Sequence, residues 1–94
     1  MFRIREVIIS PLIEEKIWSK HHVTPDEVEE VCFSDPGPLP QRGRDRGYAI
    51  YGRTEAGRYL LVALYPQGQG IFRLASARDM TETERRHYQG RRGR

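Results

Sequence analysis

Apolar and polar side chains alternate at the start of the chain and again in its second half. In residues 2–9, Phe2, Ile4 and Ile8 fall on one face of a period of two, with Arg3, Arg5, Val7 and Ile9 on the other, which predicts a short strand. Its charges predict an edge position. Three more runs with strand-like composition cover residues 48–53, 58–65 and 71–77, with short turns between them. Because hairpin-length loops join antiparallel neighbours, these runs predict an antiparallel meander.

Helical spacing replaces this alternation in three places. Ser10-Pro11 predicts a helix start, since a hydroxyl can cap the helix and proline suits its first turn. Residues 24–27 and 81–84 each carry a capping-box pattern and predict two further helices, the last ending at Gly90. The order of elements predicts an α+β domain in which two N-terminal helices and a C-terminal helix pack on one face of a mostly antiparallel sheet.

The length of 94 residues favours one domain with one modest core. We assign residues 1–90 to this domain and residues 91–94 to a basic tail. Residues 34–47 are rich in Pro, Gly and Arg, and so predict a long loop outside the core. This loop is either a functional segment, whose alternating arginines contact an anion, or a solvated linker.

Charge is distributed unevenly along the chain. Residues 1–35 carry four basic and eight acidic side chains, a net −4, whereas residues 36–94 carry twelve and five, a net +7. Fourteen of the sixteen cations are arginine, whose planar fork suits bidentate phosphate contacts. The second half therefore indicates a face for RNA or DNA, with a solvated arginine-rich surface as the alternative.

Several functional classes find no support in the sequence. The single cysteine, Cys32, excludes an internal disulfide framework and fits a reducing cytoplasm. No apolar run approaches the roughly 18 residues of a membrane span, so we expect a soluble, cytoplasmic protein with no membrane partner. No spacing of His and Cys predicts a metal site, and no glycine pattern predicts a nucleotide loop, so we expect no cofactor.

The remaining Arg, Lys, His and Tyr side chains suit RNA cleavage without a metal. In that reaction the 2′-OH attacks the neighbouring phosphate while a base takes its proton. Cations stabilise the extra negative charge, and an acid protonates the departing 5′-oxygen. Only RNA offers this internal nucleophile.

Three segments resemble, in order and spacing, the BrnT family of type II toxins: residues 20–36, 48–62 and 73–88. They carry the elements Lys-His-x-Val, Gly-Arg-Thr-x-x-Gly-Arg and Ser-Ala-Arg. The resemblance covers nearly the whole chain. It departs at residues 9–11, where a Trp-Asp-Pro-type start is replaced, and at His22, which stands in place of a glycine.

This resemblance implies a RelE-like fold and an endoribonuclease activity that arrests translation. It also implies two partners, namely RNA (mRNA or ribosome-associated) and a cognate antitoxin of ribbon-helix-helix type. A homodimer is a further option for its assembly. The competing hypothesis is a non-catalytic module with the same fold that binds RNA or an antitoxin.

We expect four catalytic residues to converge on one concave surface: His21, Arg53, Arg78 and Tyr88. By the resemblance, Arg53 and Arg78 would stabilise the scissile phosphate, and His21 or Tyr88 would assist proton transfer. The alternatives are that His21 only caps a helix end and that Tyr88 only packs over the sheet. We expect further contacts to RNA from basic side chains, namely Lys20, Arg42, Arg44, Arg46, Arg85 and Arg86.

Overall fold

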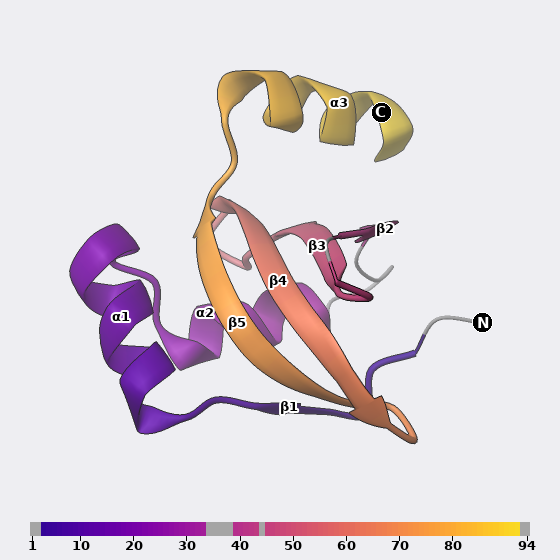
Figure 1. Cartoon of the computed structure of the whole chain (residues 1–94). Coiled ribbons are helices and arrows are strands. Elements are labelled where there is room, and N and C mark those ends of the chain that lie inside the picture. The colour runs from indigo at the N-terminus through magenta and orange to yellow at the C-terminus, as the bar shows by residue number, and fades with distance from the viewer. Residues whose placement is uncertain (1–2, 34–38, 44, 93–94) are drawn as a thin grey trace.

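The computed structural model describes residues 3–33, 39–43 and 45–92. The protein is built around a five-stranded sheet (Figure 1). Its elements in chain order are β1 (Glu6–Ile8), α1 (Pro11–His21), α2 (Pro25–Cys32), β2 (Leu39–Arg42), β3 (Tyr48–Arg53), β4 (Tyr59–Gly68), β5 (Ile71–Asp79) and α3 (Glu82–Arg92). The strand order is β1-β5-β4-β3-β2. β1 runs parallel to β5, and the other neighbouring strands are antiparallel.

The sheet corrects the predicted layout of an N-terminal strand plus a three-stranded meander. It is a mixed sheet with five strands, and its additional strand, β2, lies in the stretch assigned to a loop. β2 pairs with β3 at the other edge of the sheet, and its residues after Leu39 are exposed, so it carries no clear apolar alternation. Pro40 is tolerated there because an edge strand can leave one side of its backbone unpaired. The edge position predicted for the first strand is confirmed.

The predicted helix starts are confirmed by their hydrogen bonds. Ser10 Oγ accepts from the backbone N–H of Ile13 at 3.2 Å at the start of α1. The capping box of α2 is complete, since Thr24 N–H donates to Glu27 Oε1 at 3.0 Å and Glu27 N–H donates to Thr24 Oγ1 at 3.2 Å. In each case a side chain satisfies N–H groups that the helix itself cannot pair.

The end predicted for the last helix is wrong. α3 continues through Gly90 to Arg92, so the first two residues of the predicted tail are helical. Gly90 does not adopt the left-handed backbone conformation that ends many helices at glycine.

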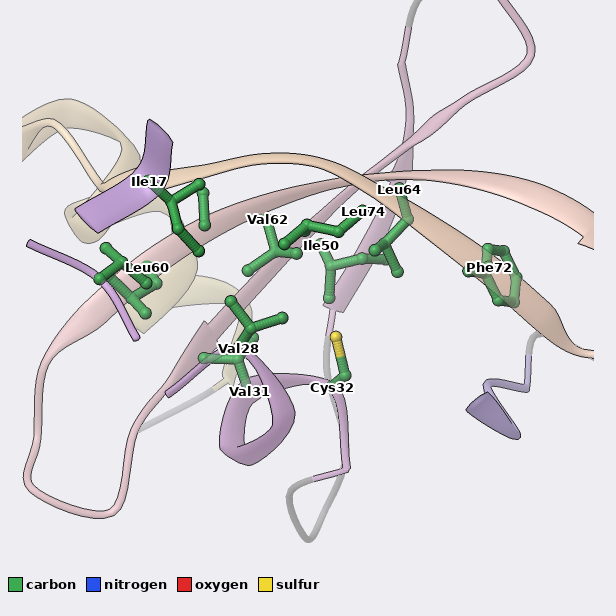
Figure 2. Packing of buried hydrophobic residues seen from close by; sticks show 12 residues of the cluster. Ile17, Val28, Val31, Cys32, Ile50, Leu60, Val62, Leu64, Phe72 and Leu74 are labelled. Carbon is green, nitrogen blue, oxygen red and sulfur yellow. The ribbon is translucent and has the colours of Figure 1, made fainter. Parts of the chain in front are cut away.

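The core lies on one face of the sheet, beneath α1 and α2 (Figure 2). Alternate residues of the strands point to that face, so each strand contributes every second side chain. The largest fully buried side chains are Ile17, Val23, Val28, Val31, Ile50, Leu60, Val62, Leu64 and Leu74. The intervening residues lie on the opposite face, which carries neither α1 nor α2 and which we call the open face.

The position of α3 corrects the expectation that all helices pack on one face. In the described part of the chain, no α3 residue belongs to the buried core. α3 stands apart from α1 and α2 (Figure 1), and its contacts are with side chains of the open face. Within the described ranges, no helix has the length and apolar character needed to cross a membrane.

Arg58 joins four parts of the fold at the edge of the core. Its guanidinium donates to the carbonyls of His21 and His22 at 2.7 and 2.8 Å. It also donates to Asp79 Oδ1 and Oδ2 at 2.8 and 3.1 Å, and to Glu27 Oε1 at 3.1 Å. The hydrogen bond from Arg58 lowers the pKa of Asp79. The start of β4 thereby fixes the end of α1, the first turn of α2 and the end of β5.

We predict that Arg58→Lys lowers the free energy of unfolding at pH 7 by about 1–2 kcal/mol, because three ammonium donors cannot replace a five-donor fork. The pKa of Asp79 is lower in the folded protein, so its contribution is fully present above the unfolded pKa of about 4 and is lost as the pH falls through the folded pKa. Urea unfolding at pH 7 and pH 3 should therefore show a smaller difference between wild type and variant at pH 3. Arg73→Lys, at an exposed arginine over Tyr65, is the matched control. Equal stability of the Arg58→Lys variant and wild type at pH 7 would contradict this role.

Candidate functional site

Aromatic and basic side chains occupy the end of the open face nearest α3. Tyr51, Leu61 and Arg78 lie opposite one another on β3, β4 and β5 and form one row. Arg53 and Tyr59 are paired in the next row on the same face. These two rows are the part of the sheet that α3 approaches.

Tyr59 is the centre of a cluster that combines β3, β4 and α3, which we call the Tyr59 cluster. The guanidinium carbons of Arg85 and Arg53 lie 4.5 and 5.9 Å from its ring centroid. The ring of Tyr88 meets it edge-on at a centroid distance of 5.9 Å, and Gln89 Nε2 donates to its hydroxyl at 3.0 Å. The hydrogen bond from Gln89 is the largest cause that lowers the pKa of Tyr59, and Arg53 and Arg85 add to it.

The two arginines of the Tyr59 cluster have no acidic partner in the described part of the chain. The ion pairs found there involve Arg58 and Arg78 only. Both Arg53 and Arg85 are exposed. Two unneutralised guanidinium groups beside a hydroxyl can bind an anion such as a phosphate by charge-assisted hydrogen bonds.

Arg78 is engaged differently. Its two terminal nitrogens donate to the two carboxylate oxygens of Glu84, each at 3.0 Å. Glu84 also completes the predicted capping box at the start of α3, which is confirmed, because it accepts from Thr81 N–H at 2.9 Å and Thr81 Oγ1 accepts from Glu84 N–H at 3.1 Å. The Arg78 hydrogen bond lowers the pKa of Glu84, so this carboxylate is ionised at neutral pH. The pair attaches the first turn of α3 to β5.

A pocket of about 340 Å³ lies between α3 and the β2–β3 edge of the sheet, and we call it the α3 pocket. The α3 residues that line the pocket are spaced so that the helical period of 3.6 residues places them on one side of the helix. Its lining residues are Leu39, Pro40, Gln41, Tyr51, Thr83, Glu84, His87, Tyr88 and Arg91. Burial is the largest cause that raises the pKa of Tyr51 at its wall, and the charge of Glu84 adds to it.

Three of the four expected catalytic residues share this region, and one does not. Arg53 and Tyr88 belong to the Tyr59 cluster, and Arg78 lies in the adjacent row. His21 ends α1, where its carbonyl accepts a hydrogen bond from Arg58, which also donates to Asp79. Asp79 is paired with the buried Leu60, so this network lies on the core face. The end of α1 therefore belongs to the core face, whereas the other three residues lie on the open face or on α3 beside it.

The residues expected to contact RNA are scattered over the molecule. Arg85 joins the Tyr59 cluster, and Arg86 is exposed on α3. Lys20 is exposed near the end of α1, and Arg46 is exposed in the turn before β3. Arg42 lies over the ring of Tyr48 at 5.7 Å and borders a second hollow of about 490 Å³. Arg44 lies outside the described residues.

Sequence reasoning missed four side chains that define this region: Tyr51, Tyr59, Glu84 and His87. The two tyrosines were treated as parts of strands, and Glu84 only as a helix cap. Strand alternation would have placed Tyr51, Arg53 and Tyr59 on the face opposite the core. In the described ranges, no three His, Cys, Asp or Glu side chains are grouped in a way that could hold a metal ion.

Comparison with known proteins gives a likeness of fold. No family model matches the chain, and no curated protein sequence matches it. Its structure is similar to the crystal structure of the Brucella abortus ribonuclease toxin, BrnT, with a TM-score of 0.69 and 15% sequence identity. The match covers 82% of this chain and 97% of that one. The BrnT-like fold expected from the sequence segments is thus confirmed.

The opposite pKa shifts of two tyrosines on the open face give a test of this geometry. We expect Tyr59 to titrate below the ordinary tyrosine pKa and Tyr51 above it. Gln89→Ala should raise the pKa of Tyr59 because it removes the hydrogen bond to the phenolic oxygen. Carbon-13 NMR of the protein with ring-labelled tyrosine, recorded between pH 8 and pH 12, measures the pKa values of both tyrosines. Gln67→Ala is the control, because within the described residues its amide donates to the neighbouring carbonyls of Tyr65 and Pro66. Titration of Tyr51 at a lower pH than Tyr59 would contradict the arrangement.

Proposed function

We propose that this protein is the toxin of a type II toxin–antitoxin system and that it inhibits translation by cleaving RNA without a metal ion. The observation that carries the proposal is the Tyr59 cluster, in which two arginines without acidic partners in the described chain lie over Tyr59, whose ring also contacts that of Tyr88. Its fold is that of a ribonuclease toxin, which supports this class of activity.

In the proposed reaction, the scissile phosphate binds between Arg53 and Arg85. The 2′-OH of the preceding nucleotide attacks phosphorus, and the two guanidinium groups stabilise the additional negative charge of the phosphorane. The two tyrosines of the cluster act as the base and the acid in this reaction. Tyr59 takes the proton of the 2′-OH, since its lowered pKa makes the phenolate more accessible, and Tyr88 protonates the departing 5′-oxygen.

Arg78 has two roles in this proposal. In the row next to the cluster its guanidinium would lie near the scissile phosphate although it is paired with Glu84, and through Glu84 it holds α3 where Arg85 and Tyr88 reach the substrate. Glu84 is already engaged by Arg78 and by the helix cap, so we do not assign it as the base. His21 has no part in the proton transfer, because the end of α1 belongs to the network on the core face.

The proposed partners are RNA and a cognate antitoxin of the ribbon-helix-helix type. The antitoxin would prevent cleavage in the cell until it is removed. A second candidate, a binding module without catalysis, is favoured by the complete pairing of Arg78 with Glu84, which reduces the free positive charge on the face. Direct measurement of cleavage separates the two functions.

We predict that the purified protein cleaves ribosome-free RNA in the presence of EDTA and leaves 2′,3′-cyclic phosphate and 5′-hydroxyl ends. Arg53→Ala should lower the cleavage rate about 100-fold, as expected for the loss of one group that stabilises the transition-state charge. Arg73→Ala is the matched control, because this arginine lies over Tyr65 towards the other end of β5. Gel analysis of end-labelled RNA gives the rates and the ends.

A single 2′-deoxy nucleotide at the cleavage position should block cleavage there, since it removes the nucleophile. RNA binding without cleavage by the wild-type protein would contradict the enzyme and support the binding module. Equal rates for Arg53→Ala and Arg73→Ala would show that the Tyr59 cluster is not the catalytic site.

A further inference from the structure

The α3 pocket has the composition of a site for a flat heteroaromatic ring. Tyr51 of β3 and His87 and Tyr88 of α3 supply aromatic groups to its walls, and Leu39 and Pro40 add apolar surface from β2. Ligand pockets of proteins typically range from about 300 to 1,000 Å³, and the volume of about 340 Å³ lies at the small end of that range. The pocket therefore suits a single small ring system better than a folded peptide segment.

The pocket and the Tyr59 cluster are adjacent. Tyr88 lines the pocket and also contacts the ring of Tyr59, so one side chain belongs to both. Glu84, at the other end of the same helix face, lines the pocket and holds Arg78 of the open face. A phosphate held by Arg53 and Arg85 would thus place an attached or neighbouring base near the entrance of the pocket.

Two of the polar groups that line the pocket, alongside Thr83, His87 and Arg91, differ in what they can recognise. The amide of Gln41 can both donate and accept hydrogen bonds, whereas the ionised carboxylate of Glu84 can only accept them. Glu84 Oε1 is occupied by Arg78 and Thr81, while Oε2 receives one bond from Arg78 and keeps further capacity. A ring that offers an amino group matches this pair, because the amino group donates to the carboxylate and a neighbouring ring nitrogen or carbonyl pairs with the amide.

We propose that the α3 pocket binds one unpaired nucleobase of the RNA and prefers a base with an exocyclic amino group, namely adenine, cytosine or guanine, over uracil. Sequence-specific recognition of RNA commonly uses unstacked bases that lie against aromatic side chains and form hydrogen bonds through their edges. The inference rests on the proposed function in taking RNA as the ligand. It adds that the pocket selects the nucleotide beside the scissile phosphate.

Binding of non-cleavable RNA tests the proposal without any need for catalysis. The probes are fluorescein-labelled, fully 2′-O-methylated trinucleotides whose central position is adenine, cytosine, guanine, uracil or abasic. With the wild-type protein, fluorescence anisotropy should show that the adenine, cytosine and guanine probes bind about 10-fold more tightly than the abasic one, as expected for one stacked base. The uracil probe should bind more weakly than these three.

Gln41 and Gln67 provide a matched pair of variants, since both side chains are exposed on strands and only Gln41 lines the pocket. Gln41→Ala should weaken binding of the adenine, cytosine and guanine probes, and Gln67→Ala should leave it unchanged. His87→Ala, at an exposed helix position, should reduce the difference between the base-containing and abasic probes. Circular dichroism confirms that each variant is folded.

Equal affinity of the wild-type protein for all five probes would overturn the proposal, and so would an unchanged affinity of Gln41→Ala for the adenine, cytosine and guanine probes. Cleavage of unmodified trinucleotides, measured in parallel, separates this outcome from a failure of the proposed function. Cleavage without any dependence on the central base would refute the base pocket alone. Base-dependent binding without cleavage would support the pocket and refute the nuclease.

Discussion

The hydrogen bonds of the Arg58 guanidinium join the two N-terminal helices to the ends of β4 and β5. All three of its nitrogens donate hydrogen bonds. The acceptors are the backbone carbonyls of His21 and His22 at the end of α1 and the carboxylates of Glu27 and Asp79. The carbonyls at the end of a helix lack partners within that helix. The Arg58 guanidinium donates to these carbonyls at the turn between α1 and α2. This contact fixes the α1–α2 pair over one face of the sheet and leaves the opposite face free of those helices.

Two neighbouring residues on β5 then serve opposite faces. Asp79 points to the core face and holds Arg58, whereas Arg78 points to the open face and holds Glu84 of α3. One strand end therefore positions the N-terminal helices on one side and the C-terminal helix on the other. α3 has almost no apolar surface to bury, so polar contacts such as Arg78–Glu84 and Gln89–Tyr59 attach it. The α3 pocket exists because the helix is held beside the sheet rather than packed tightly onto it.

Local patterns in the sequence predicted much of the fold, because caps and strand alternation depend on residues close together in the chain. The bounds of β3 and the starts of all three helices were predicted in this way. β2 could not be predicted in this way, because an exposed edge strand that contains Pro40 shows no apolar alternation. The site was predicted in part: Arg53, Arg78 and Tyr88 share one side of the sheet, but sequence spacing could not show that His21 belongs to the other. The sequence of α3 likewise could not show which face of the sheet the helix lies on, because α3 is polar and has no apolar stripe.

One sheet thus separates the face that packs the core from the face proposed to bind RNA. Titration of the isotope-labelled protein with a non-cleavable, 2′-O-methylated RNA, followed by NMR, tests it most directly. The account predicts that the largest chemical-shift changes fall on the open face and α3, at Tyr51, Arg53, Tyr59, Arg85 and Tyr88. Changes concentrated at Lys20 and His21, with the open face unaffected, would contradict it.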